Sequence, residues 1–355
     1  MFLHNRVDWR ILKEKMEQSH EARITFSFYN YAHLEKPEIL RDQLYADWAK
    51  LAVFGRVYIS KEGINAQVSV LKENFQKFQQ HLDSIEFLKG VRLNIAVEDD
   101  GKSFYKLKMK VREKIVADGL EDSNFDVTKK GKHLNAEEFN QLTDDPDTIV
   151  VDMRNHYESE VGHFENAFLP DADTFRDALP IVKETLAPYK DKNIIMYCTG
   201  GIRCEKASAY FKHLGFKNVH QLEGGIIKYA KDVSEKGLTN KFRGKNFVFD
   251  ERLGEKISDE VISSCHQCGQ PCDTHTNCQN DTCHLLFIQC GECAAKYEGC
   301  CSTDCREFIQ LPEEEKKSLR KSFRKQRNVF KKGRVEHLKD QRANTSLISD
   351  SVQES

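Results

Sequence analysis

Hydrophobic and polar positions over the first hundred residues follow two different periods. Segments rich in aromatic and β-branched residues predict strands, and segments with apolar residues at helical spacing predict helices. The strands are expected at 24–32, 55–60, 64–70 and 91–99, and the helices at 38–53 and 73–85. The resulting order of strand, helix, strand, strand, helix, strand is that of a ferredoxin-like α+β sandwich. We therefore expect a ferredoxin-like domain, with the basic segment described next, over residues 1–120.

The segment SFYKLKMKVREKIVADG at 103–119 alternates with a period of two. As a strand, it would present one mostly apolar face and one almost wholly cationic face. Lysines on an edge strand could simply deter aggregation. A cationic face without an intervening acid also fits a polyanion, and we favour RNA binding. The residues concerned are Lys106, Lys108, Lys110, Arg112 and Lys114.

Two later segments are apolar without interruption, TIVVDM at 148–153 and NIIMY at 193–197. Strands that are buried on both faces of a parallel sheet have this character, whereas half-exposed strands alternate. Helical patterns lie between and after them. We therefore expect a doubly wound α/β domain over residues 121–242.

The rest of the chain is distinguished by cysteine and by charge. Ten of the twelve cysteines follow Arg243, and we expect a cysteine-rich module over 243–312. The segment 316–334 has ten Lys or Arg and no Asp or Glu, which predicts a basic helix suited to phosphate backbones. A disordered tail is expected from Val335, so that 313–355 forms the last region.

Composition and termini narrow the class of protein. With 355 residues, 39% hydrophobic and 31% charged, the chain is expected to be globular with several domains. The N-terminal MFLHNRVDWR has no apolar stretch of signal-peptide length, and no segment is apolar enough to span a membrane. We therefore expect a cytoplasmic protein without membrane contact. In a reducing compartment its cysteines should be thiols or metal ligands.

The segment CTGGIRC, residues 198–204, joins an apolar strand to a predicted helix. Cys198 thus lies at the carboxyl end of a parallel strand, where open α/β sheets place their chemistry. The two glycines let backbone amides turn toward the sulfur, and the dipole of a helix that starts near Arg203 points at the same place. These effects favour a nucleophilic thiolate. The active-site loop would consist of Thr199, Gly200, Gly201 and Ile202.

Loop size excludes a tyrosine phosphatase. Those enzymes place five residues between cysteine and arginine, whereas four separate Cys198 from Arg203. The smaller loop suits a terminal sulfur or another small group on Cys198. Cys204, one turn into the helix, could resolve a persulfide or disulfide on Cys198, or could merely pack.

Three motifs in order resemble a rhodanese domain. Besides the loop, VVDMRNHYESEVGHFENA at 150–167 is similar to that family's upstream signature, and LEGGI at 222–226 to its closing motif. The resemblance implies a persulfide on Cys198, with Arg203 as loop anchor and anion partner. The residues that match the upstream signature are Asp152, Arg154, Glu158, Gly162, His163 and Ala167. We expect the first three of these to brace the fold rather than take part in chemistry.

Two CxxC pairs about twenty residues apart have the spacing of a structural zinc site, which we assign to Cys265, Cys268, Cys290 and Cys293. Such a closed site would have no catalytic role. A second, cross-braced site could use Cys278, Cys283, Cys300 or Cys301, and Cys305, with Cys272 and His284 as substitutes. The alternative is a set of thiols without metal.

The order of these regions resembles that of the bacterial rhodanese-like, oxygen-dependent tRNA uridine(34) hydroxylases, up to about Arg334. The similar strings are KEGINAQ (61–67), VADG (116–119), DMRNHYE (152–158), YCTGGIRCEKAS (197–208), GKNFVFDER (244–252) and CHQCG (265–269). The resemblance implies formation of 5-hydroxyuridine at the wobble position of tRNA. It also implies molecular oxygen as co-substrate and the anticodon region of tRNA as partner.

The residues themselves supply a reactive thiol and a cationic surface, but no redox group. We find no flavin or nicotinamide fingerprint and no iron triad of two histidines and a carboxylate. Cys198 or its persulfide could add to C6 of a splayed-out uridine and activate C5. Two alternatives remain, a persulfide sulfurtransferase acting on tRNA or a small acceptor, and an RNA-binding protein whose rhodanese domain is a scaffold.

Overall fold

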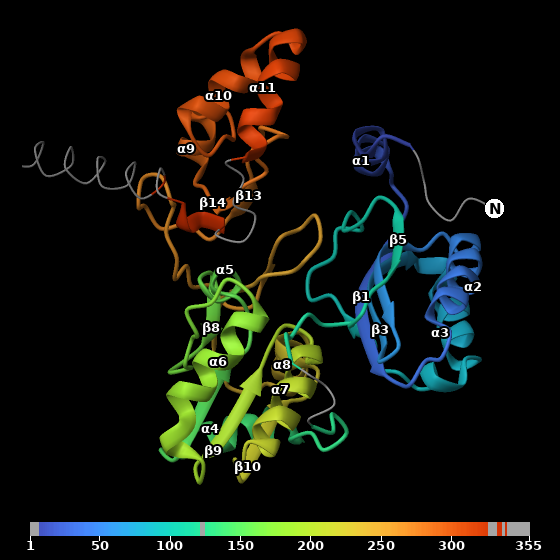
Figure 1. Cartoon of the computed structure of the whole chain (residues 1–355), viewed down its shortest axis with the longest axis vertical. Coiled ribbons are helices and arrows are strands. Elements are labelled where there is room, and N and C mark those ends of the chain that lie inside the picture. Colours follow the sequence, from blue (N-terminus) through green and yellow to red (C-terminus); the bar gives the residue numbers. More distant parts are fainter. Residues whose placement is uncertain (1–6, 121–124, 326–331, 336–337, 339–355) are drawn as a thin grey trace, which may run out of the picture.

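The computed structural model describes residues 7–120, 125–325, 332–335 and 338. Three lobes follow one another along the chain: a blue N-terminal lobe, a green and yellow central lobe and an orange C-terminal lobe (Figure 1). The expectation of a multidomain α/β protein is confirmed.

The N-terminal lobe is a five-stranded sheet with the strand order β4-β1-β3-β2-β5. Its first four strands have the ferredoxin-like order predicted from the sequence. The strands are β1 (Arg23–Tyr31), β2 (Phe54–Ser60), β3 (Gly63–Leu71), β4 (Asn94–Ile95) and β5 (Leu107–Val111), and the helices are α1 (Trp9–Gln18), α2 (Pro37–Lys50) and α3 (Phe75–Asp83). The strand expected at 91–99 is therefore much shorter, with only two residues paired to β1.

Helices α2 and α3 cover one face of this sheet only (Figure 1). Phe26 and Phe28 of β1 point to that face and pack against Trp48 of α2 and Phe78 of α3. Because side chains alternate along a strand, the residues between them point to the opposite face. That helix-free face is turned toward the central lobe.

The basic segment forms an edge strand, β5, parallel to β2. Leu107 and Met109 are buried while Lys108 and Lys110 are exposed, as the two-residue period predicted. The strand ends at Val111, however, and is shorter than the segment 103–119. Lys114 lies beyond it and forms an ion pair of 2.8 Å with Asp118 instead of joining the exposed strand face.

The central lobe contains a four-stranded parallel sheet with the order β6-β10-β9-β7. Its strands are β6 (Lys132–Leu134), β7 (Thr148–Asp152), β9 (Asn193–Tyr197) and β10 (Asn218–Leu222), and its helices are α4 (Ala136–Thr143), α5 (His156–Ser159), α6 (Phe175–Leu186), α7 (Ile202–His213) and α8 (Gly225–Lys236). One core packs α6 and α7 against the sheet, and a second packs α4 and α8 against its other face. The two uninterrupted apolar runs are the buried strands β7 and β9, as expected.

The C-terminal lobe is attached to the central lobe through β11, which pairs with β8. Strand β8 (Gly162–Phe164) belongs to the central lobe (Figure 1). The strands that follow are β11 (Phe242–Asn246), β12 (Glu255–Lys256), β13 (His275–Asn277) and β14 (Leu286–Ile288), and the helices are α9 (Gly291–Lys296), α10 (Thr303–Gln310) and α11 (Glu313–Lys325). The basic helix is thus present up to Lys325, but it begins with three glutamates. Residues 326–331, and most of the tail expected to be disordered, lie outside the described residues. Among the residues that are described, no helix has both the length and the apolar character needed to cross a bilayer.

Candidate functional site

Cys198 follows β9 directly, and its loop leads into α7 at Ile202. The turn depends on Gly201, the residue before the helix, which has φ 99°. A side chain there would be strained, and its Cβ would lie 2.9 Å from the hydroxyl oxygen of Tyr29 in the N-terminal lobe. The sequence CTGGIRC therefore forms the tight strand-to-helix turn that its glycines predicted.

The sulfur of Cys198 is buried and surrounded by hydrogen-bond donors. The backbone amide of Gly201 donates to Sγ at 3.2 Å, and the amides of Arg203 and Cys204 also point at it. Burial raises the pKa of Cys198, but the hydrogen bond from Cys204, the charge of Arg203 and the two amides lower it more, to about 6. At neutral pH the thiolate therefore predominates.

Cys204 is equally buried, but its chemistry is different. Burial and then the hydrogen bond to Cys198 raise the pKa of Cys204 well above that of an ordinary thiol. Cys204 thus remains protonated and donates to the neighbouring sulfur. It also belongs to the core between α7 and the sheet, which supports the packing role over that of a resolving thiol.

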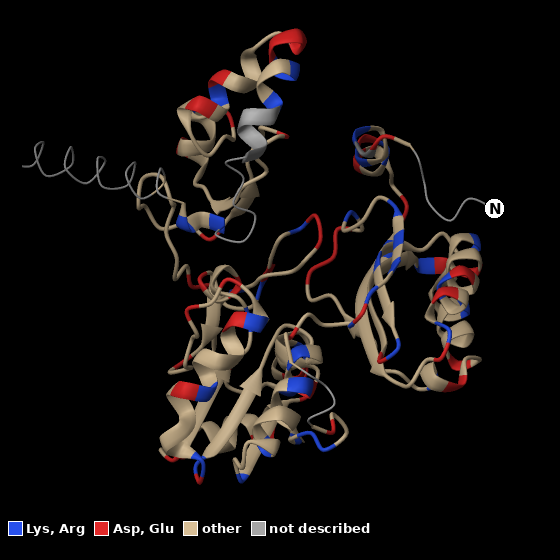
Figure 2. Cartoon of the chain, in the orientation of Figure 1, with Lys and Arg blue, Asp and Glu red and all other residues tan. Residues whose placement is uncertain are grey.

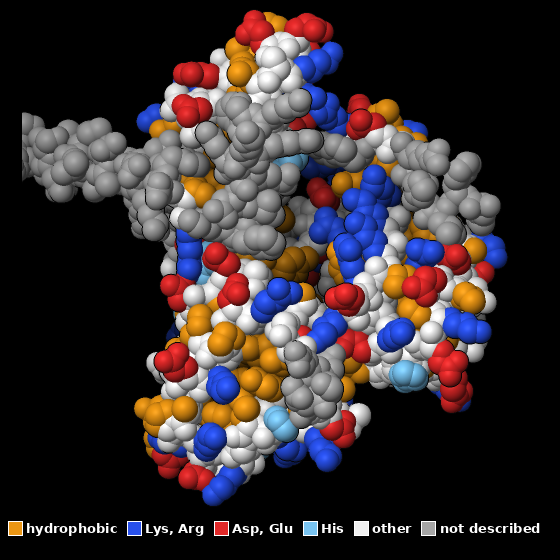
Figure 3. Space-filling model, in the orientation of Figure 1, with side chains coloured by type: hydrophobic (Ala, Val, Ile, Leu, Met, Phe, Trp, Pro, Cys, Tyr) orange, Lys and Arg blue, Asp and Glu red, His pale blue; other side chains and the backbone are white. Residues whose placement is uncertain are grey.

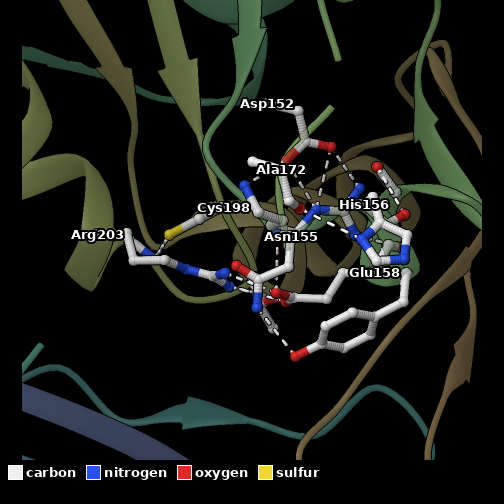
Figure 4. Close-up of polar contacts among 12 residues, drawn as sticks. Asp152, Asn155, His156, Glu158, Ala172, Cys198 and Arg203 are labelled. Atoms are coloured by element: carbon white, nitrogen blue, oxygen red, sulfur yellow. Dashed lines mark hydrogen bonds and ion pairs between the residues drawn. The ribbon is translucent and has the colours of Figure 1, made fainter. Parts of the chain in front are cut away.

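Arg203 is held by Glu158 through two ion-pairing hydrogen bonds of 2.7 and 2.8 Å (Figure 4). Glu158 is fixed in turn by the capping box at the start of α5, where it accepts from the backbone amide of Asn155 at 3.0 Å. Because the two charge-assisted hydrogen bonds to Glu158 fix the guanidinium in place, its positive charge stays beside the Cys198 thiolate. Arg203 therefore anchors the loop, and Glu158 braces Arg203.

The remaining residues of the upstream signature lie behind this arrangement. Arg154 and Asp152 form a fully buried pair at 2.7 Å, and Arg154 also donates to the carbonyl oxygen of Gly162 at 2.6 Å. Gly162 approaches the next strand so closely that a Cβ would lie 2.1 Å from the carbonyl oxygen of Lys245. These residues brace the fold, as expected.

A cavity of about 390 Å³ lies over the loop and is lined by all three lobes. The central lobe contributes Asn155, Cys198, Thr199, Gly200, Ile202 and Arg203. The N-terminal sheet contributes Ser27, Tyr29, Arg56, Tyr58, Asn65, Gln67 and Asn94, and the C-terminal lobe contributes Phe249, Asp250, Arg252 and Glu255. Figure 3 shows the hollow between the lobes. The sheet residues were not predicted as site residues, although polar positions on the helix-free face of predicted strands were a usable signal for them.

The sheet wall of the cavity continues onto the basic strand. Arg56 and Tyr58 of β2 lie opposite Lys108 and Lys110 of β5, so the four side chains share one face. Lys106 precedes β5, and Arg112 follows it with its guanidinium 5.9 Å from the ring of Tyr58. Figure 2 shows the cations along β5, and Figure 3 shows Lys and Arg side chains gathered beside the hollow.

Eight cysteines of the C-terminal lobe form two clusters of four, each with its sulfurs within 4.8 Å of one another. The clusters are Cys265, Cys268, Cys290 and Cys293, and Cys278, Cys283, Cys301 and Cys305. The first is the predicted set, and the second uses Cys301 rather than Cys300. Sulfurs about 2.3 Å from a tetrahedral zinc would lie about 3.8 Å apart. The Sγ atoms of Cys283 and Cys301 are 3.8 Å apart, so the clusters have the size of metal sites.

Comparisons with known proteins agree with this division of the chain. Family models match residues 23–115 (UPF0176 acylphosphatase like domain), 135–232 (Rhodanese-like domain) and 243–306 (Rhodanase C-terminal). A tRNA uridine(34) hydroxylase of Photorhabdus laumondii is 56% identical over 98% of this chain and 99% of its own length. One of Yersinia pestis is 58% identical over 94% of each. A solved rhodanese-like domain protein of Staphylococcus aureus is 24% identical, with a TM-score of 0.23 over 28% of this chain and 90% of its own.

The low pKa of Cys198 can be measured through the ultraviolet absorbance of its thiolate, as the difference between the wild type and Cys198→Ala. We expect a titration midpoint near pH 6, with the thiolate lost as the pH falls below it. Cys204→Ala removes a donor to the thiolate and should move the midpoint upward. Cys272→Ala, at a thiol outside the loop and both clusters, should leave it unchanged. A wild-type midpoint near that of a free thiol, about 8.5, would contradict stabilisation of the Cys198 thiolate by the loop amides, Cys204 and Arg203.

Proposed function

The chain belongs to the tRNA uridine(34) hydroxylase family, and from that premise we propose that it hydroxylates C5 of the wobble uridine of tRNA with Cys198 as nucleophile. The observation that carries this proposal is a low-pKa thiolate on the wall of a cavity large enough for a pyrimidine base. Molecular oxygen is the co-substrate that the family resemblance implies.

Uridine C5 becomes reactive when a nucleophile adds at C6. In the proposed reaction the Cys198 thiolate forms a bond to C6, and the electron pair of the C5–C6 double bond moves onto C5 and the O4 carbonyl. Arg203 and the loop amides surround the sulfur of Cys198 and in the proposed reaction would stabilise the thiolate that attacks C6 and is later expelled. A hydroperoxide, which would have to form from dioxygen with two electrons from an external reductant, would then be attacked by C5: the C5–O bond forms, the O–O bond breaks and the second oxygen leaves as hydroxide. Loss of the C5 proton and expulsion of the thiolate then restore the double bond.

The cavity wall has the chemistry of a base-binding site. Tyr29, Tyr58 and Phe249 offer aromatic faces for stacking, and Asn65 and Gln67 offer amides for the polar edge of a base. A uridine must leave the anticodon stack to enter, which single-stranded loops permit at low cost. These features support the anticodon region of tRNA as the part that binds.

Beside the cavity, the basic strand would hold the phosphate backbone. Burial, and then repulsion by Lys106, Arg56 and Lys110, lower the pKa of Lys108. Cations this close repel one another, and binding of an anion such as a phosphate relieves that repulsion. Lys106, Lys108, Lys110 and Arg112 therefore remain the proposed RNA contacts. Lys114, paired with Asp118, is the weakest of the predicted five.

Zinc is the metal that suits the two cysteine clusters. Four thiolates without an open position make a structural site, which stabilises the lobe and does not activate oxygen. The clusters interleave along the chain, so each metal would close a loop that contains ligands of the other. Zinc would thereby hold together a lobe that otherwise has few regular elements.

Nucleoside mass spectrometry of tRNA tests the proposed reaction. A strain lacking this protein should regain 5-hydroxyuridine when it is complemented with the wild type or with Cys272→Ala, which alters a buried thiol outside the site. Cys198→Ala should restore none, because the nucleophile is lost. Unchanged hydroxylation with loss of a thiolated nucleoside would contradict the proposal and indicate a sulfurtransferase.

Steady-state kinetics with purified tRNA tests the basic strand. Lys108→Ala together with Lys110→Ala should raise KM about tenfold or more, leave kcat nearly unchanged, and reduce the salt dependence of binding by about two phosphate contacts. Lys231→Ala, at an exposed position of α8, is the matched control. A loss of kcat at unchanged KM would contradict a role in RNA binding.

A further inference from the structure

The active-site helix contains a buried lysine that the proposed reaction does not use. Lys206 lies one turn after the loop, and its side chain is 1% exposed. Its Nζ lies 2.6 Å from Glu62 Oε2 and 2.6 Å from Asp118 Oδ2, and 6.0 Å from the ring centre of Tyr31. A lysine is almost never buried unless it is paired, so this position needs an explanation.

Both carboxylates come from outside the central lobe's helix. Glu62 is in the turn between β2 and β3, and its other oxygen accepts from the backbone amide of Ile115 at 2.7 Å. Asp118 is in the linker that leads from β5 to the central lobe, and it also pairs with Lys114 at 2.8 Å. Among the described residues, two cations and two carboxylates thus form a quartet whose formal charges cancel. The quartet joins the N-terminal sheet, the linker and α7.

Other contacts between the lobes concentrate on the same end of α7. The hydroxyl of Tyr31 donates to the carbonyl oxygen of Ile202 at 3.3 Å, and that of Tyr29 donates to Glu205 at 3.1 Å. The side-chain amide of Asn94 donates to the carbonyl oxygen of Gly200 at 3.3 Å. The helix-free face of the sheet is therefore fixed directly against the loop that carries Cys198.

Buried ion pairs add little net stability, because desolvation offsets much of their attraction. They do penalise any arrangement in which one charge loses its partner. If the N-terminal lobe rotated away from α7, Lys206 would leave both carboxylates, and the cavity between the lobes would open. The quartet therefore favours the relative position of the two lobes in which these buried charges keep their partners.

We propose that Lys206 is a positioning residue that fixes the N-terminal sheet over the Cys198 loop, so that the base-binding cavity has its working shape. The proposal rests on the function proposed above, since it assigns the cavity to a nucleobase. Lys206 does not line the cavity assigned to the base. Its effect passes through Glu62, Asp118 and the sheet.

The test compares three variants of the full chain. Lys206→Met keeps an unbranched side chain that is one atom shorter, but leaves the quartet with a net negative charge. Lys206→Met with Glu62→Gln restores neutrality and keeps an oxygen for the Ile115 amide. Lys212→Met changes an exposed lysine on the same helix and is the control. The readouts are kcat and KM for tRNA, the titration midpoint of Cys198, and hydrogen exchange in the linker at 112–120.

We expect Lys206→Met to lower kcat/KM about a hundredfold, because small misplacements of a binding wall cost this much. Linker exchange should increase, while the Cys198 midpoint stays near that of the wild type, because the donors around the sulfur belong to the loop. The neutral double variant should recover part of the activity and of the protection. Lys212→Met should match the wild type.

Wild-type kcat/KM in Lys206→Met would overturn the proposal, and so would a shifted Cys198 midpoint that accounts for the loss. If Lys206→Met does not fold, the double variant alone provides the test. Full activity in a double variant whose linker amides are unprotected would then contradict the proposed role of the quartet. If the wild type forms no 5-hydroxyuridine, the proposed function fails. Linker exchange then still tests whether Lys206 fixes the two lobes.

Discussion

A buried negative charge on Cys198 is the constraint on which the site depends. A thiolate removed from water needs donors and a cation around it, and the loop supplies the amides of Gly201, Arg203 and Cys204. Arg203 is itself buried and needs Glu158, whose position follows from the cap of α5. The upstream signature and the cysteine loop are far apart in sequence, yet Glu158 of the first compensates the charge of Arg203 in the second.

The second constraint is that the Cys198 loop by itself does not form the cavity in which a substrate would bind. The cavity exists because a ferredoxin-like sheet leaves one face free of helices and turns it toward the loop. That face carries aromatic and amide side chains near Cys198 and cations farther out on β5. One sheet thus provides a continuous surface from the proposed base site to the proposed phosphate contacts.

The sequence predicted those features that depend on local pattern. The strand order of the N-terminal lobe, the buried strands β7 and β9, the position of Cys198 and the first cysteine cluster follow from period, composition and spacing. The limits of pattern are clear in Lys114, which keeps the alternation but lies beyond the end of the strand and pairs with Asp118. Spacing could not choose between Cys300 and Cys301, since adjacent residues differ only in the direction of their side chains. The cavity wall and the contacts of Lys206 arise between lobes, where local pattern gives no information.

The most direct test of the account is whether Cys198 bonds to the base. An anticodon stem-loop RNA with 5-fluorouridine at the wobble position should trap the adduct, because fluorine replaces the hydrogen that must leave C5. Peptide mass spectrometry after reaction should find the RNA fragment on the peptide that contains Cys198, and no adduct in Cys198→Ala. An enzyme that hydroxylates the matching uridine RNA, yet forms no adduct or forms it at another residue, would contradict nucleophilic catalysis by this cysteine.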